Sequence, residues 1–80
     1  MSEKIKLIWD FKGPTALQTA LHHEKHLKEF IEQTQYPLNI TGHHALNEMH
    51  SLAFMVVKKD DMIKIRDILR PHRGEIHAEP

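Results

Sequence analysis

The stretch that decides the fold is residues 50–58, "HSLAFMVVK", the strongest strand pattern in the chain. Alternate side chains of a strand point to opposite faces of a sheet. One face of this segment carries His50, Leu52, Phe54 and Val56. The other face carries Met49, Ala53, Met55 and Val57. Because both faces are apolar, we expect a central strand that is covered on both sides.

The segments on either side alternate between strand and helix patterns. Residues 4–11, "KIKLIWDF", alternate as a second central strand, and residues 15–34 have helical periodicity that ends at Tyr36-Pro37. A weaker strand is expected over 38–42, followed by a connection over 42–49 that could hold a helical turn. A short helix over about 60–70, capped by Asp60-Asp61, and a final strand over 74–80 complete the chain.

The order β-α-β-β-α-β in so short a chain predicts an α+β ferredoxin-like sandwich, with a four-stranded antiparallel sheet and two helices on one face. We expect a single domain over residues 1–80. Because the helices cover only one face of the sheet, the second apolar face of residues 50–58 predicts a homodimer through the open sheet face, of the dimeric α+β-barrel type. A ligand on that open face is the alternative.

Composition excludes several classes of function. Eleven basic and eleven acidic residues cancel, which argues against broad nucleic-acid binding. The absence of cysteine excludes a disulfide scaffold and thiolate metal sites. The N-terminus has no long apolar run, so we expect no signal peptide, no membrane partner and a cytoplasmic location. Eight histidines in eighty residues are the unusual feature.

Three of these histidines lie in "LHHEKHLKEF", residues 21–30, within the expected first helix. On a helical wheel, His22 and His26 lie one turn apart on the outer side, where we expect mostly solvated side chains. His23 and Glu24 lie within the apolar stripe that should face the sheet. The zinc-protease pattern His-Glu-x-x-His is absent because Leu27 occupies the position of its second histidine.

A core-facing histidine beside a carboxylate needs partners, and a purely structural role is one reading. The other is a small site in which His23 is a metal ligand or a general base, with Glu24 as ligand or orienting group. Asp10, His50 and His77 could join it if strand faces and registers agree. A set of histidines and carboxylates without cysteine suits Ni(II), Zn(II), Cu(II) or Co(II), with no choice among them.

Three short motifs carry a resemblance to a known family. The chain passes from a strand into Gly13-Pro14-Thr15, has His23-Glu24 followed by Leu27 in the helix, and ends with "GEIH" at residues 74–77. In this it resembles the small stand-alone ferredoxin-like proteins that include nickel-responsive, nickel-binding homodimers. The resemblance implies a dimer and nickel binding, with His23 and His77 at the positions of recurrent histidines.

Three hypotheses follow. The first is a divalent-metal-binding homodimer that uses His23 and His77, with Glu24 and His50 as further candidates. The second is a cofactor-free enzyme of isomerase or monooxygenase type acting on a small apolar substrate. In that enzyme His23 or Asp10 would be the base, and the pocket would be lined by Trp9, Phe54 and Met55. The third is a structural or regulatory dimer without a site, which predicts that every buried polar group is satisfied.

Overall fold

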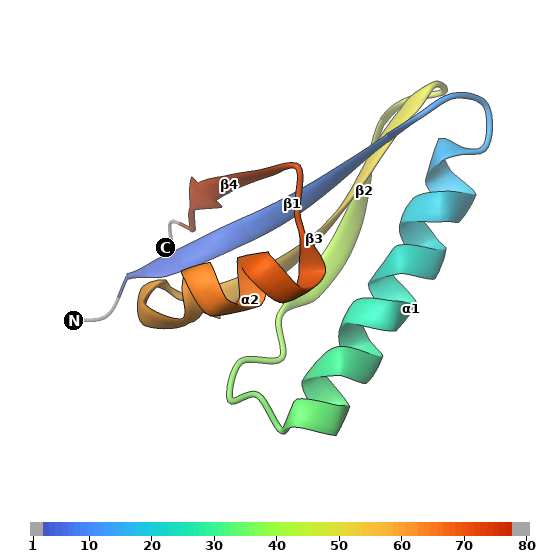
Figure 1. Cartoon of the computed structure of the whole chain (residues 1–80). Helices are drawn as coiled ribbons and strands as arrows, with labels where there is room; N and C mark the ends of the chain where they lie inside the picture. The colour runs from blue at the N-terminus through green and yellow to red at the C-terminus, as the bar shows by residue number, and fades with distance from the viewer. Residues whose placement is uncertain (1–2, 78–80) are drawn as a thin grey trace.

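The computed structural model describes residues 3–77 as one antiparallel sheet with two helices (Figure 1). The strands are β1 (Lys4–Lys12), β2 (Thr41–Asn47), β3 (His50–Lys58) and β4 (Arg73–Ile76). The helices are α1 (Ala16–Thr34) and α2 (Met62–Leu69), the latter preceded by the 3-10 turn η1 (Lys59–Asp61). The strand order is β2-β3-β1-β4. This confirms the ferredoxin-like α+β fold and the central position of β1 and β3.

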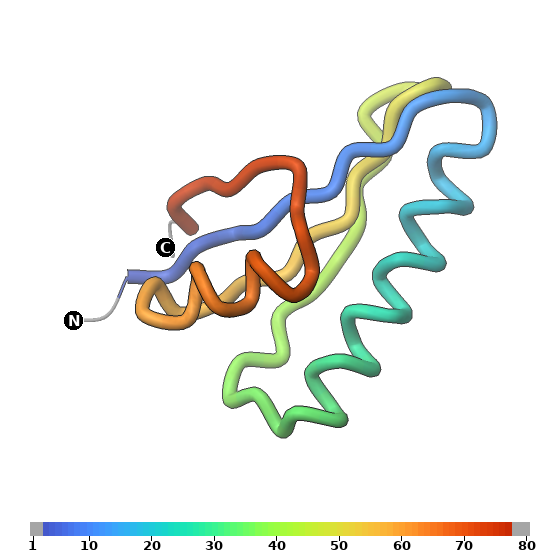
Figure 2. Tube along the Cα trace, in the orientation of Figure 1, coloured from blue at the N-terminus to red at the C-terminus, as the bar shows by residue number. Residues whose placement is uncertain are grey.

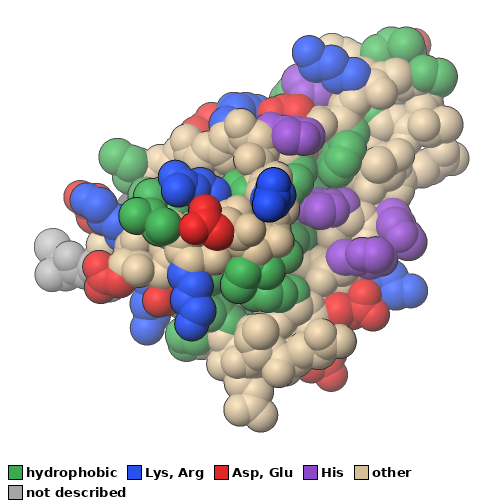
Figure 3. All heavy atoms as spheres, in the orientation of Figure 1, with side chains coloured by type: hydrophobic (Ala, Val, Ile, Leu, Met, Phe, Trp, Pro, Cys, Tyr) green, Lys and Arg blue, Asp and Glu red, His purple; other side chains and the backbone are tan. Residues whose placement is uncertain are grey.

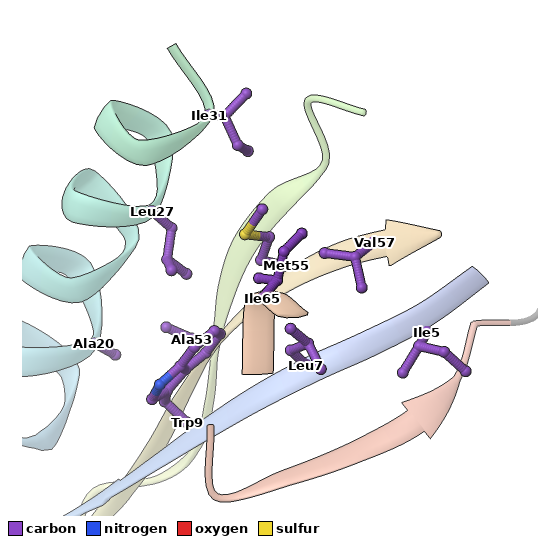
Figure 4. Packing of buried hydrophobic residues seen from close by; sticks show 10 residues of the cluster. All are labelled: Ile5, Leu7, Trp9, Ala20, Leu27, Ile31, Ala53, Met55, Val57 and Ile65. Carbon is purple, nitrogen blue, oxygen red and sulfur yellow. The ribbon is translucent and has the colours of Figure 1, made fainter. Parts of the chain in front are cut away.

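The register of β1 and β3 determines which side chains face the helices. Leu7 pairs with Met55 and Trp9 pairs with Ala53, and both pairs point into the core. From the helices, Ala20, Leu27, Ile31 and Ile65 meet them, as Figure 4 shows. Helix α1 supplies three of these residues and α2 the fourth, so both helices cover one face of the sheet. The indole Nε1 of Trp9 also donates a hydrogen bond to the Leu69 carbonyl at 3.2 Å, which ties β1 to the end of α2.

The opposite, open face of the sheet is less exposed than its sequence suggests. Ile8 and Val56 on this face are 2% and 0% exposed within the single chain. The Phe54 ring lies against Gly42 of β2, and the Lys6 ammonium lies 4.3 Å from the ring centroid. Long side chains and this ring therefore cover much of the apolar surface. The sequence analysis predicted a homodimer because the open face was expected to expose apolar side chains. Those side chains are largely covered within the single chain, so this argument for the homodimer is weakened, and the homodimer stays a prediction.

The segment between α1 and β3 differs from the prediction. The strand expected over 38–42 begins only at Thr41, and most of the 42–49 segment expected to be a connection is β2 itself. Pairing with β3 extends the strand, starting where the Val56 N–H donates to the Ile40 carbonyl. A strand neighbour supplies hydrogen bonds that local sequence preference does not reveal, so tertiary context overrode the weak pattern. A turn follows in which the Asn47 side chain accepts the Met49 N–H at 2.8 Å.

The ends of the helices agree with the sequence except at one cap. Helix α1 ends at Thr34, and Gln35 adopts a left-handed conformation before Tyr36-Pro37, as predicted. The second helix forms as η1 and α2, but its N-terminus has no side-chain cap. The Asp61 carboxylate accepts the Tyr36 hydroxyl at 2.8 Å instead. The last strand ends at Ile76, and residues 78–80 of the predicted strand lie outside the described residues.

Helices α1 and α2 run in different directions over the same face of the sheet (Figure 2). Within residues 3–77, neither of them is long and apolar enough to cross a membrane.

Candidate functional site

His23 lies half-buried against two aromatic rings of β1. Its ring centroid is 4.7 Å from that of Trp9 and 5.6 Å from that of Phe11. Among the described side chains, His23 Nε2 is a buried polar atom without a hydrogen-bond partner. A buried polar group without a partner is costly, and such atoms are uncommon in folded proteins. The expectation of a purely structural chain, that every buried polar group is satisfied, is therefore not met at this atom.

The surroundings of His23 keep its imidazole uncharged. Burial lowers its pKa, and the nearby His26, His72 and His22 lower it further by charge repulsion. Desolvation disfavours the cationic form of an imidazole, and further positive charge nearby acts in the same direction. His23 is therefore neutral at physiological pH and has one ring nitrogen with a free lone pair.

His22 and His26 lie on the exposed side of α1, as the helical wheel predicted. Their ring centroids are 4.5 Å apart with the rings tilted by 53°. His26 is one turn from His22 at spacing i,i+4 and one turn from His23 at spacing i,i+3, which are the spacings at which helical side chains meet. We call His22, His23 and His26 the α1 histidine cluster. Figure 3 shows histidine side chains gathered in a band on the face that includes the outer side of α1.

His72 borders this cluster from the loop between α2 and β4. Its ring centroid is 6.3 Å from that of Phe11. Its Nδ1 accepts the backbone N–H of Asp10 at 2.8 Å. This hydrogen bond uses the Nδ1 lone pair and assigns the ring proton to Nε2. In this arrangement, His72 has no lone pair left for a metal ion.

Asp10 and His50 form a separate polar group on the open face of the sheet. His50 Nε2 is 2.9 Å from Asp10 Oδ1, and Arg73 donates from Nε to Asp10 Oδ2 at 2.8 Å. The hydrogen bond from Arg73 lowers the pKa of Asp10 to about 2, because together with His50 it outweighs the effect of burial. Such a carboxylate is a weak base, which disfavours the hypothesis that Asp10 is the general base.

Glu24 is held by β2 rather than by its neighbour His23. Its Oε1 is 2.8 Å from His43 Nδ1, and its Oε2 is 3.5 Å from the Lys28 ammonium. Burial raises the pKa of Glu24, but the hydrogen bond from His43 and the charge of Lys28 outweigh burial and leave the pKa lowered. The sequence analysis missed His43 because it assigned this residue to a loop. Recognising β2 as a strand, together with its register against β3, would have placed His43 on the helix-covered face, because His43 pairs with the core residue Ala53.

The four predicted metal ligands do not converge within one chain. His23 and Glu24 lie on the helix-covered face, whereas His50 points to the open face beside Asp10. The His77 N–H donates to the Lys4 carbonyl, which places His77 at the opposite end of β1 from Asp10. Within residues 3–77, no three histidine, aspartate or glutamate side chains form a preformed metal centre.

The predicted pocket residues are likewise divided between the two faces. Trp9 and Met55 belong to the core, whereas Phe54 covers the open face. An open groove of about 350 Å³ does lie between α1 and α2, but none of these three residues lines it. Its walls are Phe30, Thr34, Tyr36, Pro37, Asp61, Lys64, Ile65 and Ile68.

Comparisons of this chain with family models, with curated proteins and with solved structures gave no match.

Proposed function

We propose that the protein binds a divalent transition-metal ion, of the Ni(II), Zn(II), Cu(II) or Co(II) class, at the α1 histidine cluster. The observation that carries this proposal is the buried, unpartnered Nε2 of His23 beside two further imidazoles. A metal ion would give this histidine the partner that the surrounding protein does not supply.

The chemistry of the cluster suits these ions. Imidazole nitrogen is a good ligand for all four, and a ligand has to be deprotonated to bind. The lowered pKa of His23 reduces competition from protons. The His22 and His26 ring centroids are 4.5 Å apart, so the two imidazoles are close enough to share one ion. The third protein ligand requires the His23 ring to turn towards His26, and water completes the coordination.

The proposal differs from the sequence hypothesis in its ligands. It keeps His23 and the metal class, and it replaces His77, Glu24 and His50 with His22 and His26. Glu24 is already held by His43 and Lys28, and His50 is held by Asp10. A site on one helix needs no second copy of the chain.

A cofactor-free enzyme has less support. The low pKa of Asp10 makes it a weak base, and Trp9 and Phe54 lie on opposite faces of the sheet. His23 as a base would need a substrate that reaches its buried nitrogen.

The test is thermal melting of chelator-treated protein with each of the four metal ions in turn. At a free metal concentration about ten times Kd, binding to the folded state alone should raise Tm by roughly 10 °C for a domain of this size. His26→Gln should abolish most of the shift, because His26 neighbours both other histidines. His44→Gln is the matched control, since His44 is an exposed histidine on β2 outside the cluster.

Two results would contradict the proposal. One is that none of the four ions changes Tm. The other is that His44→Gln reduces the shift as much as His26→Gln does, which would indicate nonspecific binding to surface histidines.

A further inference from the structure

The two edges of the sheet are protected very differently. Strand β4 is four residues long, and its Arg73 is paired with Asp10 and with Glu75. Charged side chains and short length are the usual means by which proteins keep a sheet edge from pairing with another chain. Strand β2 forms the other edge, and its seven residues, "TGHHALN", contain no lysine, arginine, aspartate, glutamate or proline.

The outward main-chain groups of β2 follow from its register. Ile40 accepts the Val56 N–H, so residues 40, 42 and 44 direct their N–H and C=O groups towards β3. In an antiparallel ladder, the intervening residues direct theirs away. Within the part of the chain that the structure describes, Thr41, His43 and Ala45 therefore present free donors and acceptors along the edge.

Exposed apolar side chains lie at the hairpin end of this edge. The Gly13 N–H donates to the Met49 carbonyl at 2.7 Å, which joins the β2–β3 turn to the start of α1 (Figure 1). Leu17 and Leu21 of α1 are each 43% exposed, and Leu46 of β2 is 47% exposed. A strand edge without lysine, arginine, aspartate or glutamate, with exposed apolar side chains at its hairpin end, is suited to pairing with another strand.

We propose that β2 pairs antiparallel with β2 of a second copy of this chain, forming a dimer with a continuous sheet. The occupant is a second copy because an antiparallel edge is complementary to itself about a two-fold axis. With His43 opposite His43 of the second copy, Thr41 of each chain lies opposite Ala45 of the other. This register forms about six main-chain hydrogen bonds. The edge has no lysine, arginine, aspartate or glutamate that would repel its copy, and the chain has a formal net charge of zero at pH 7.

This dimer differs from the one predicted through the open sheet face, and amide hydrogen exchange distinguishes them. Edge pairing should slow exchange at Thr41, His43 and Ala45 as protein concentration rises. Pairing through the open face would leave these amides exchanging at the same rate at every concentration.

The mutational test is sedimentation velocity over a range of protein concentrations. Ala45→Pro removes an outward N–H that β3 does not use, and Ala45→Val keeps it. Leu46→Glu replaces an exposed apolar side chain of the edge strand with a charged one, which is a usual means of keeping a sheet edge from pairing. We expect the wild type and Ala45→Val to dimerise, and Ala45→Pro and Leu46→Glu to dimerise at least tenfold more weakly.

Circular dichroism and Trp9 fluorescence verify that each variant is folded. If Ala45→Pro does not fold, the dimerisation of Leu46→Glu alone tests the proposal. A wild type that stays monomeric at several hundred micromolar would overturn the proposal. Equal dimerisation of Leu46→Glu and the wild type, with no concentration-dependent protection of the β2 amides, would overturn it as well.

Discussion

A single methyl group at Gly42 tests how the open face is packed. A Cβ added to Gly42 would lie 2.5 Å from Phe54 Cζ and 2.6 Å from Phe54 Cε2. Ordinary contacts between carbon atoms are about 3.5–4.0 Å, so the overlap is about 1 Å. Gly42→Ala therefore has to displace the ring, and we expect it to lower the free energy of unfolding by about 1–3 kcal/mol.

Removing the ring should reverse the sign of this effect. In a Phe54→Ala background, nothing of the ring remains to be displaced, and alanine is favoured over glycine within a strand by roughly 0.5–1 kcal/mol. The two substitutions should therefore be coupled by about 2 kcal/mol or more. Urea denaturation of the four proteins, followed through the fluorescence of Trp9, the single tryptophan, measures this coupling.

Gly74→Ala is the matched control for this cycle. A Cβ at Gly74 would lie 3.6 Å from Ile5 Cγ2 and 3.8 Å from Leu7 Cδ2, which are ordinary contacts. We expect this variant to be as stable as the wild type or slightly more so. If Gly42→Ala costs the same free energy with and without the Phe54 ring, the ring does not cover Gly42 and the packing described for the open face is wrong.

Two further predictions concern titratable groups. Asp10 has a folded-state pKa of about 2, below its unfolded value near 4, so its stabilising effect is complete above pH 4 and is lost as pH falls through 2. Asp10→Asn should lower the free energy of unfolding by about 1–2 kcal/mol at pH 7. In urea unfolding measured at a series of pH values, the variant should lose less stability than the wild type as the pH falls below about 4. Tyr36, the only tyrosine, has its pKa raised to about 12 because of its burial and its hydrogen bond to Asp61, although the Lys58 N–H opposes the shift. Phenolate absorbance should therefore rise with a midpoint near pH 12, and a midpoint near pH 10 in protein that is still folded by circular dichroism would contradict this contact.

The sequence predicted the elements whose patterns are strong. Residues 4–11 and 50–58 alternate clearly, and the apolar stripe of α1 places His23 and Glu24 towards the sheet, as the structure shows. The sequence-based prediction of strands failed at β2, where histidines and small residues give little local preference for a strand. There the conformation depends on hydrogen bonds from β3, which no local pattern encodes.

The hydrogen-bond partners of the polar side chains were harder to predict from the sequence than the helices and strands. Strand parity showed that His50 shares a face with Phe54, but it could not show that this face is the open one. That choice depends on the register between β1 and β3, which places Asp10 beside His50 and away from His23. The pairing of Glu24 with His43 likewise required the position of β2.

The most direct test of the central claim, metal binding at the α1 histidine cluster, is an NMR titration of nitrogen-15-labelled protein with Zn(II). Zn(II) is diamagnetic, so the ring nitrogens of individual histidines can be followed. We predict that His22, His23 and His26 shift together and saturate at one equivalent of metal, while His44 is unchanged. Shifts spread evenly over all the histidines without saturation, or no shift in these three, would contradict the proposed site.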